Sequence, residues 1–122
     1  MMKPLRSRFV LAVPDLRRSV TFYQEVLGLR LEFESPGWAF LGLDGFQVML
    51  GECPDALPAD TLGDHSYFAY ITVQELKALA EELQAKGVEC IQPLEDKSWG
   101  MRELGIRTPD GHRIMFGEVL PG

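Results

Sequence analysis

Side chains of the types that bind metal ions recur in this chain, and they stand at Glu52, His65, His112 and Glu118. Each of the two acids closes a similar pentapeptide, VMLGE at 48–52 and IMFGE at 114–118. Carboxylate oxygens and imidazole nitrogens can together hold a divalent cation. A metal site assembled from two related segments is therefore the first hypothesis that the sequence raises.

The pentapeptides belong to a longer internal repeat. RFVLAVPDL at 8–16 aligns with FAYITVQEL at 68–76, because both are alternating apolar runs that break at Val-x-acid-Leu. The segment 37–52 aligns with 100–118 through shared Leu-Gly, Asp-Gly and Met-x-Gly-Glu letters. Two copies of one strand–helix–three-strand unit explain these matches. We expect a single domain over 1–122, with module one at about 6–52, a linker at about 53–64 and module two at about 65–120.

The helix of each copy has recognisable ends. Asp15 is a suitable N-cap for the first helix, and Gly28 can adopt the left-handed conformation that stops it. Thr72 and Glu75 have the spacing of a capping box, and Gly87 should end the second helix. Apolar side chains at helical spacing are expected to face the core: Val20, Tyr23, Leu27, Leu76, Leu79 and Leu83.

Each copy also carries a hairpin signal. The dipeptide Asp44-Gly45 lies between two apolar runs and predicts a two-residue type I′ turn. A two-residue loop in the second copy would bury Arg107 beneath the helix. We therefore expect Pro109-Asp110 at the centre of a type I turn, with Gly111 as a bulge residue.

Alternation along the strands sorts their side chains between two faces. One face is apolar and should lie beneath the helix, whereas the opposite face, called the inner face below, mixes aromatic, thioether and polar groups. The predicted inner face comprises Arg8, Trp38, Phe40, Gln47, Met49, Phe68, Tyr70, Glu103 and Met115. Such a mixture is typical of small-molecule pockets, although the same face could pack against another sheet or another subunit.

Two segments resemble motifs of a known superfamily, VPDLRRSVTFYQEVLGL at 13–29 and WGMRELGIRTPDGHRIMFGE at 99–118. The first resembles the Asp-Leu…Ser…Phe-Tyr…Leu-Gly helix of the vicinal oxygen chelate superfamily, and the second resembles its Pro-Asp-Gly hairpin. That group includes glyoxalase I, extradiol dioxygenases, fosfomycin-resistance enzymes and bleomycin-resistance proteins. The resemblance covers about residues 6 to 120. It implies an α+β fold of two tandem βαβββ modules, with curved mixed sheets around a concave pocket and helices on the outside.

Enzymes of this superfamily bind a divalent metal through the first and last strands of each module. The resemblance places those four positions at Arg8, Met49, Phe68 and Met115. Arginine has no lone pair to offer, phenylalanine coordinates nothing, and a thioether is too soft for Mg, Mn or Fe. Glu52, Glu118 and His65 lie three positions away from such slots, and an odd shift reverses the face of a strand. We therefore expect no metal site and no cofactor.

Two further residues are candidates for ligand contact. The segment SWGMRE at 98–103 resembles the part of bleomycin-resistance proteins that carries an aromatic groove residue, which nominates Trp99. The alternative is a loop tryptophan that packs on its own chain. Glu103 is the best single acid, and we interpret it as a ligand contact or an ion-pair partner, with Arg8 as a candidate partner, rather than as a base.

The main hypothesis is a metal-independent protein, similar to the bleomycin-resistance proteins, that sequesters an antibiotic-like aromatic or cationic small molecule as a homodimer. The second hypothesis is a metal-dependent lyase, isomerase or dioxygenase with a rearranged metal site. The third is a metal-free enzyme that uses Glu103. The main hypothesis assigns no catalytic residue.

Overall composition narrows the class of partner. The net charge is −6 without a basic cluster, which argues against nucleic acid. No apolar run reaches the roughly 18 residues that a membrane helix needs, and the N-terminus has no signal-peptide pattern, so we expect a cytoplasmic protein without a membrane partner. Cys53 and Cys90 lack metal-like spacing and are interpreted as reduced thiols.

Overall fold

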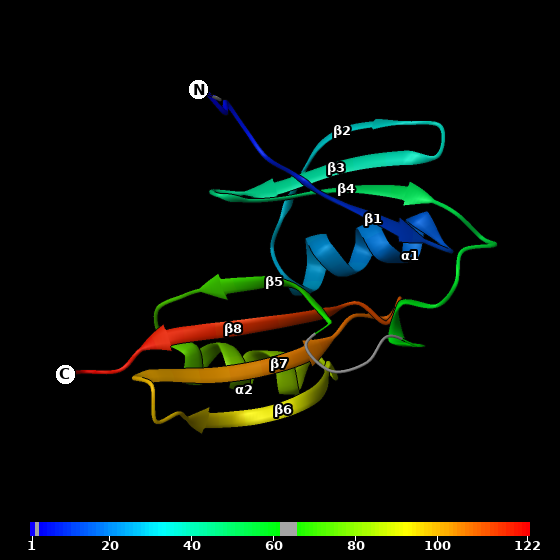
Figure 1. Ribbon diagram of the computed structural model, residues 1–122. Coiled ribbons are helices and arrows are strands. Elements are labelled where there is room, and N and C mark those ends of the chain that lie inside the picture. Colours follow the sequence, from blue (N-terminus) through cyan, green and yellow to red (C-terminus); the bar gives the residue numbers. More distant parts are fainter. Residues whose placement is uncertain (2, 62–65) are drawn as a thin grey trace. The chain divides into compact units, whose positions relative to one another are not determined.

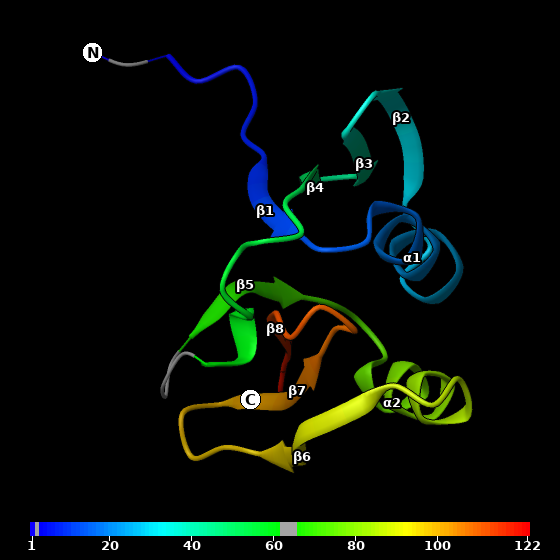
Figure 2. The same ribbon diagram turned by 90° about the vertical axis from the view of Figure 1, so that its right-hand side faces the viewer.

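A computed structural model of the chain describes residues 1, 3–61 and 66–122. The chain forms two compact units, Met1–Leu57 and Pro58–Gly122, and their boundary falls inside the stretch 53–64. Each unit is a four-stranded mixed sheet with a helix against it (Figure 1; Figure 2). This is the α+β fold with two tandem βαβββ modules that the repeat predicts. In the described ranges, no helix is long and apolar enough to cross a membrane.

The first unit begins its sheet one residue after Arg8. Its elements are β1 (Phe9–Val13), α1 (Leu16–Thr21), the π-helical turn η1 (Phe22–Val26), β2 (Arg30–Ser35), β3 (Trp38–Leu43) and β4 (Phe46–Glu52). The strand order is β1-β4-β3-β2, with β1 parallel to β4. The π-helical turn changes the phase of the helix. Phe22 and Tyr23 are therefore both buried, whereas Val20 and Leu27 of the predicted stripe are half-buried.

The second unit repeats this arrangement. Its elements are η2 (Ala59–Thr61), β5 (Tyr67–Thr72), α2 (Leu76–Ala85), β6 (Glu89–Asp96), β7 (Met101–Arg107) and β8 (Arg113–Val119). The strand order is β5-β8-β7-β6, with β5 parallel to β8. Leu76 and Leu83 of the predicted stripe are buried and Leu79 is half-buried, so the expected core face of α2 is confirmed.

The apolar core of each unit lies between its helix and the sheet. In the first unit Leu41, Val48 and Leu50 are fully buried, and in the second Ile106 and Ile114 are. Burial of one such side chain contributes about 1.5–3 kcal/mol relative to exposure. The predicted apolar face is therefore confirmed in the middle of the strands. At the tip of the first hairpin, in contrast, Leu43 is exposed.

Of the two predicted turns, one is confirmed in full. Gly111 has a φ of +90°, and its N–H donates to the Thr108 carbonyl at 2.9 Å, as a type I turn with a glycine bulge requires. The first hairpin has the predicted two-residue loop, because Leu43 pairs with Phe46. Its predicted type I′ geometry is wrong: Asp44 has a φ of 51°, but Gly45 lacks the second positive φ that this turn needs.

The start of α1 is as predicted. The Asp15 side chain accepts a hydrogen bond from the backbone N–H of Arg18 at 3.2 Å, the geometry of an N-cap. Gly28 and Gly87 follow their helices with φ values of 77° and 75°. They supply the left-handed conformation that stops each helix.

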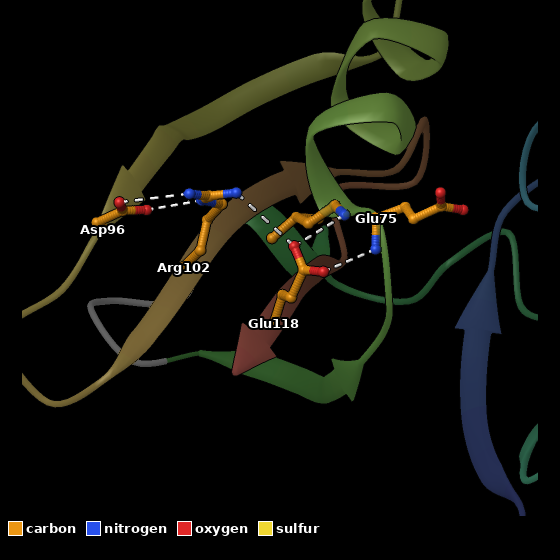
Figure 3. Close-up of polar contacts among 5 residues, drawn as sticks. Glu75, Asp96, Arg102 and Glu118 are labelled. Carbon is orange, nitrogen blue, oxygen red and sulfur yellow. Dashed lines mark hydrogen bonds and ion pairs between the residues drawn. The ribbon is translucent and has the colours of Figure 1, made fainter. Parts of the chain in front are cut away.

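The predicted capping box of α2 is wrong. Thr72 is the last residue of β5, and Glu75 occupies the N-cap position with a left-handed φ of 56° and no side-chain cap bond. The carboxylate of Glu118 in β8 takes over the capping role, because it accepts the backbone N–H groups of Glu75 and Leu76 (Figure 3). The helix start is thus secured by a residue distant in sequence.

Candidate functional site

The inner face of the first unit is lined by aromatic side chains. Trp38 is 39% exposed, and its ring lies directly over the backbone of Gly51. A Cβ built on Gly51 would stand 2.9 Å from the ring, so the missing side chain makes room for the indole. Phe40 meets Phe33 edge to face, with ring centroids 5.4 Å apart. The predicted positions of Trp38 and Phe40 are confirmed.

Polar groups interrupt this aromatic surface at one place. The guanidinium carbon of Arg8 lies 5.1 Å from the centroid of the Phe40 ring, a cation–π contact. Phe9 pairs with Val48, so Arg8, which immediately precedes β1, lies next to Gln47 of β4. Arg8 Nε and Gln47 Oε1 are buried and have no hydrogen-bond partner among the described residues. A bound ligand could satisfy both groups.

A β-bulge adds two residues that alternation did not predict. The register of β2 shifts between Leu31 and Phe33. Phe33 therefore pairs with Phe40, while the Glu32 carboxylate also reaches this face, 3.0 Å from where a Cβ of Gly42 would stand. A bulge places consecutive side chains on one face. No short sequence pattern predicts the bulge in β2.

In the second unit the inner face is organised around a buried acid. Glu103 is 7% exposed, and its Oε2 accepts hydrogen bonds from the Tyr70 hydroxyl at 2.7 Å and from Trp99 Nε1 at 3.3 Å. The three predicted residues are therefore in contact. Trp99 fits both alternatives, since its indole bonds its own chain while 64% of the residue remains exposed.

The hydroxyl of Tyr70 is held in its neutral form. Burial of this hydroxyl, then its hydrogen bond to Glu103, then the negative charge of Glu103, together raise the pKa of Tyr70 to about 12. Tyr70 as a whole is 49% exposed, and its hydroxyl and one edge of its ring lie over Gly117. A tyrosine with this pKa serves as a hydrogen-bond donor at neutral pH.

Tyr67 is a further residue of this face that sequence reasoning missed. The register of β5 shifts between Tyr67 and Ala69, and a Cβ on Gly105 would stand 2.9 Å from the Tyr67 hydroxyl. Met115, which is buried, pairs with Tyr70 and with Gly105. The second unit thus presents two tyrosines where alternation predicted one.

The remaining predicted aromatic residue of this unit, Phe68 in β5, contacts the turn between β7 and β8. Phe68 contacts the ring of His112 edge to face, with centroids 6.0 Å apart. Burial lowers the pKa of His112, an effect that Asp110 partly opposes. The ring of His112 is thus a structural neighbour of Phe68 within its own unit.

The residues at the superfamily's metal positions do not fit a metal ion. Met49 pairs with Phe40, Met115 pairs with Tyr70, and Arg8 lies against an aromatic ring. In the part of the chain that the structure describes, no group of three or more His, Cys, Asp or Glu side chains could hold a metal. His65 lies outside the described residues.

A cavity of about 300 Å³ lies on the other side of the second sheet, between α2 and the strands β6 and β7. Its lining is mainly apolar and consists of Ala80, Leu83, Gln84, Val88, Cys90, Pro93, Leu94, Leu104 and Ile106. None of the predicted ligand-binding residues lines it. This cavity is therefore separate from the inner face.

Two tandem βαβββ units define the class of the vicinal oxygen chelate fold. The sequence model of the Glyoxalase/Bleomycin resistance protein/Dioxygenase superfamily matches residues 6–116, and the chain belongs to this family. The resemblance that the helix and hairpin motifs indicate is thereby confirmed.

Relatives of this chain include proteins with different activities. It is 31% identical over 111 residues to the glutathione transferase FosA of Serratia marcescens, covering 88% of this chain and 76% of that protein. It is 31% identical over 119 residues to the lactoylglutathione lyase of Haemophilus influenzae, covering 89% and 88%. Among solved structures, TioX from Micromonospora sp. ML1 is 27% identical, with a TM-score of 0.73 and coverage of 93% and 99%.

Proposed function

We propose that this protein binds an antibiotic-like aromatic or cationic small molecule on its inner faces and holds it without metal and without reaction. One observation carries the proposal. The inner faces display aromatic side chains, while the superfamily's metal positions hold Arg8, Met49, Phe68 and Met115. This set favours stacking and cation–π contact over coordination.

The exposure of the aromatic side chains supports this proposal. Trp38 and Tyr70 lie on the inner faces, and Trp99 lies beside Glu103 of the inner face. All three remain exposed, although large apolar side chains are usually buried. Flat aromatic faces bind planar or cationic groups with about 0.5–2 kcal/mol per contact. Several such contacts together would give a useful affinity for a planar drug.

We further propose a cytoplasmic homodimer. A second copy would cover part of the exposed apolar surface, such as Val10 and Phe33. Cys53 and Cys90 are free and exposed, which suits a reducing compartment. Light scattering after size exclusion should give a mass of about twice 13.7 kDa. A mass that stays at the single-chain value at all concentrations would contradict the proposed homodimer.

The binding proposal is tested by calorimetry with metal-free bleomycin and other aromatic antibiotics, in the presence of EDTA. The protein's two tryptophans, Trp38 and Trp99, should report the same event through quenched emission. Trp38→Phe and Trp99→Phe would assign the signal to one inner face. If no compound binds more tightly than millimolar, the drug-binding function is lost.

The names of two relatives favour a second candidate, a metal-dependent lyase, isomerase or dioxygenase. FosA of Serratia marcescens is a glutathione transferase and the Haemophilus influenzae relative is a lactoylglutathione lyase, so both are enzymes. Elemental analysis after purification with added Ni, Mn or Fe separates the two candidates. Stoichiometric metal together with turnover that a chelator abolishes would favour the enzyme.

A further inference from the structure

The buried carboxylate of Glu103 has neutral partners and no cation beside it in its own unit. Both of its hydrogen bonds come from uncharged donors, the Tyr70 hydroxyl and Trp99 Nε1, and both reach Oε2. The second oxygen, Oε1, accepts no hydrogen bond from the described residues. Over the described residues of the second unit, no lysine or arginine forms an ion pair with Glu103.

The neighbouring cations are engaged elsewhere. Lys97 Nζ lies 3.0 Å from Glu95 Oε1 and 5.8 Å from the centroid of the Trp99 ring. Arg102 Nε lies 2.7 Å from Asp96 Oδ1, and Figure 3 shows this ion pair. These pairs leave the negative charge of Glu103 without a counter-charge within its unit.

An ionised carboxylate in such a position is costly unless a positive group approaches it. Neutral hydrogen-bond donors offset part of this cost, and the neutral state of Tyr70 described above fits that role. Next to the acid stand two aromatic side chains with much of their surface exposed, Tyr70 and Trp99. A carboxylate beside partly exposed aromatic rings is a combination that recognises organic cations, and the contact of Lys97 Nζ with the Trp99 ring shows that this ring accepts a cationic neighbour.

We infer that Glu103, Tyr70 and Trp99 form a binding site for the alkylammonium group of a ligand. Oε1 of Glu103 accepts the ammonium N–H, and the rings of Tyr70 and Trp99 contact the alkyl carbons next to the charge. This inference rests on the proposed function and narrows it, because it selects a cationic ligand and assigns its charged end to the second unit.

Calorimetry with a matched series of small probes tests the charge requirement directly. Benzylammonium, benzyl alcohol and benzoate share one ring and differ in charge. We expect the wild-type protein to bind benzylammonium at least tenfold more tightly than benzyl alcohol, and benzoate least of all. Equal affinity for the ammonium and the alcohol would overturn the inference, and this comparison needs no variant.

Variants then locate the site. Glu103→Gln keeps an oxygen acceptor for Tyr70 and Trp99 but removes the charge, so the preference for benzylammonium over benzyl alcohol should disappear. The matched control is Glu81→Gln, which removes the same charge from an exposed position on α2 and should leave the preference unchanged. A preference that survives in a folded Glu103→Gln protein would contradict the assignment.

The two proposals can fail separately. If aromatic antibiotics bind but the charge series shows no preference, the binding function stands and the ammonium site is wrong. If the series shows the preference and no antibiotic binds, the ammonium site stands and drug sequestration is wrong. If Arg8 or a second copy of the chain supplied the cation that pairs with Glu103, the wild-type protein would show no preference for benzylammonium over benzyl alcohol.

Discussion

The carboxylate of Glu118, near the end of β8, accepts a hydrogen bond from the backbone N–H of Leu76 at the start of α2, with 3.1 Å between the two atoms. The same carboxylate also accepts the N–H of Glu75 at 2.8 Å. Glu52 makes the equivalent bond to the N–H of Leu16, 3.1 Å away, at the start of α1. The acid that closes each repeated pentapeptide therefore caps the helix of its own unit.

Removing these caps should destabilise the fold to different degrees. Glu118→Ala loses two hydrogen bonds to a helix start and is expected to lower the free energy of unfolding by about 1–2 kcal/mol. Glu52→Ala loses a single, exposed bond and should cost about 0.5–1 kcal/mol. Urea denaturation followed by circular dichroism measures both. A Glu118→Ala protein as stable as the control variant Glu81→Ala would contradict the capping role.

The repeat and the turn signals were enough to predict the fold. Alternation placed Leu41 and Ile106 in the core, and the Pro-Asp-Gly sequence placed Gly111 in its bulge. The bulges in β2 and β5 escaped prediction, because a bulge changes which face a side chain occupies without a distinctive residue pattern. Glu32 and Tyr67 joined the inner face for that reason.

Contacts between residues distant in the sequence could not be predicted from local patterns. Local spacing suggested Thr72 as the cap of α2, whereas the group that caps this helix, Glu118, lies more than forty residues further along the chain. The contact of Glu103 with Tyr70 likewise joins β7 to β5, two strands that β8 separates in the sheet. Pattern reasoning named both residues, but it could not pair them.

The pKa of Tyr70 provides a direct measure of the Glu103 contact. Glu103→Gln removes the negative charge, so the pKa of Tyr70 should fall from about 12 toward its ordinary value of 10.0. Titration of tyrosinate absorbance, with Tyr70→Phe to identify the signal, measures the change. An unchanged pKa in Glu103→Gln would show that the charge of Glu103 does not act on Tyr70.

The same shift predicts how stability depends on alkaline pH. A tyrosine whose pKa is higher in the folded state than in the unfolded state binds its proton more tightly when folded. Its contribution to stability is present below pH 10 and is lost as the pH rises through about 12. The wild-type protein should therefore lose more stability over this interval than Tyr70→Phe. Parallel stability curves would contradict the prediction.

The lowered pKa of His112 predicts that the free energy of unfolding decreases toward acidic pH. Its pKa is lowered in the folded state by burial, so the unfolded chain binds protons more readily. Stability should be complete above about pH 6.5 and should decrease as the pH falls below it. His112→Gln should flatten this decrease, whereas His65 is present in both proteins and cancels in the comparison. Denaturation at pH 7 and pH 5 tests this, and an equal loss in both proteins would refute it.

Gly51 should be intolerant of a side chain because the Trp38 ring lies over it. An alanine Cβ would stand 2.9 Å from the ring, so Gly51→Ala must displace the indole. We expect a loss of about 1–3 kcal/mol, as in other overpacked sites, and a shift of tryptophan emission. Gly45→Ala is the matched control, because nothing lies within 4 Å of its added Cβ. Equal behaviour of the two variants would argue against the position of Trp38.

The central claim is metal-independent binding on the inner faces, and titration of the EDTA-treated protein with metal-free bleomycin, followed by tryptophan emission, tests it most directly. We expect saturable quenching with a Kd well below millimolar, weakened in Trp99→Phe and unaffected by added Ni, Mn or Fe. Absence of quenching across the aromatic antibiotics, or binding that appears only when metal is restored, would contradict it.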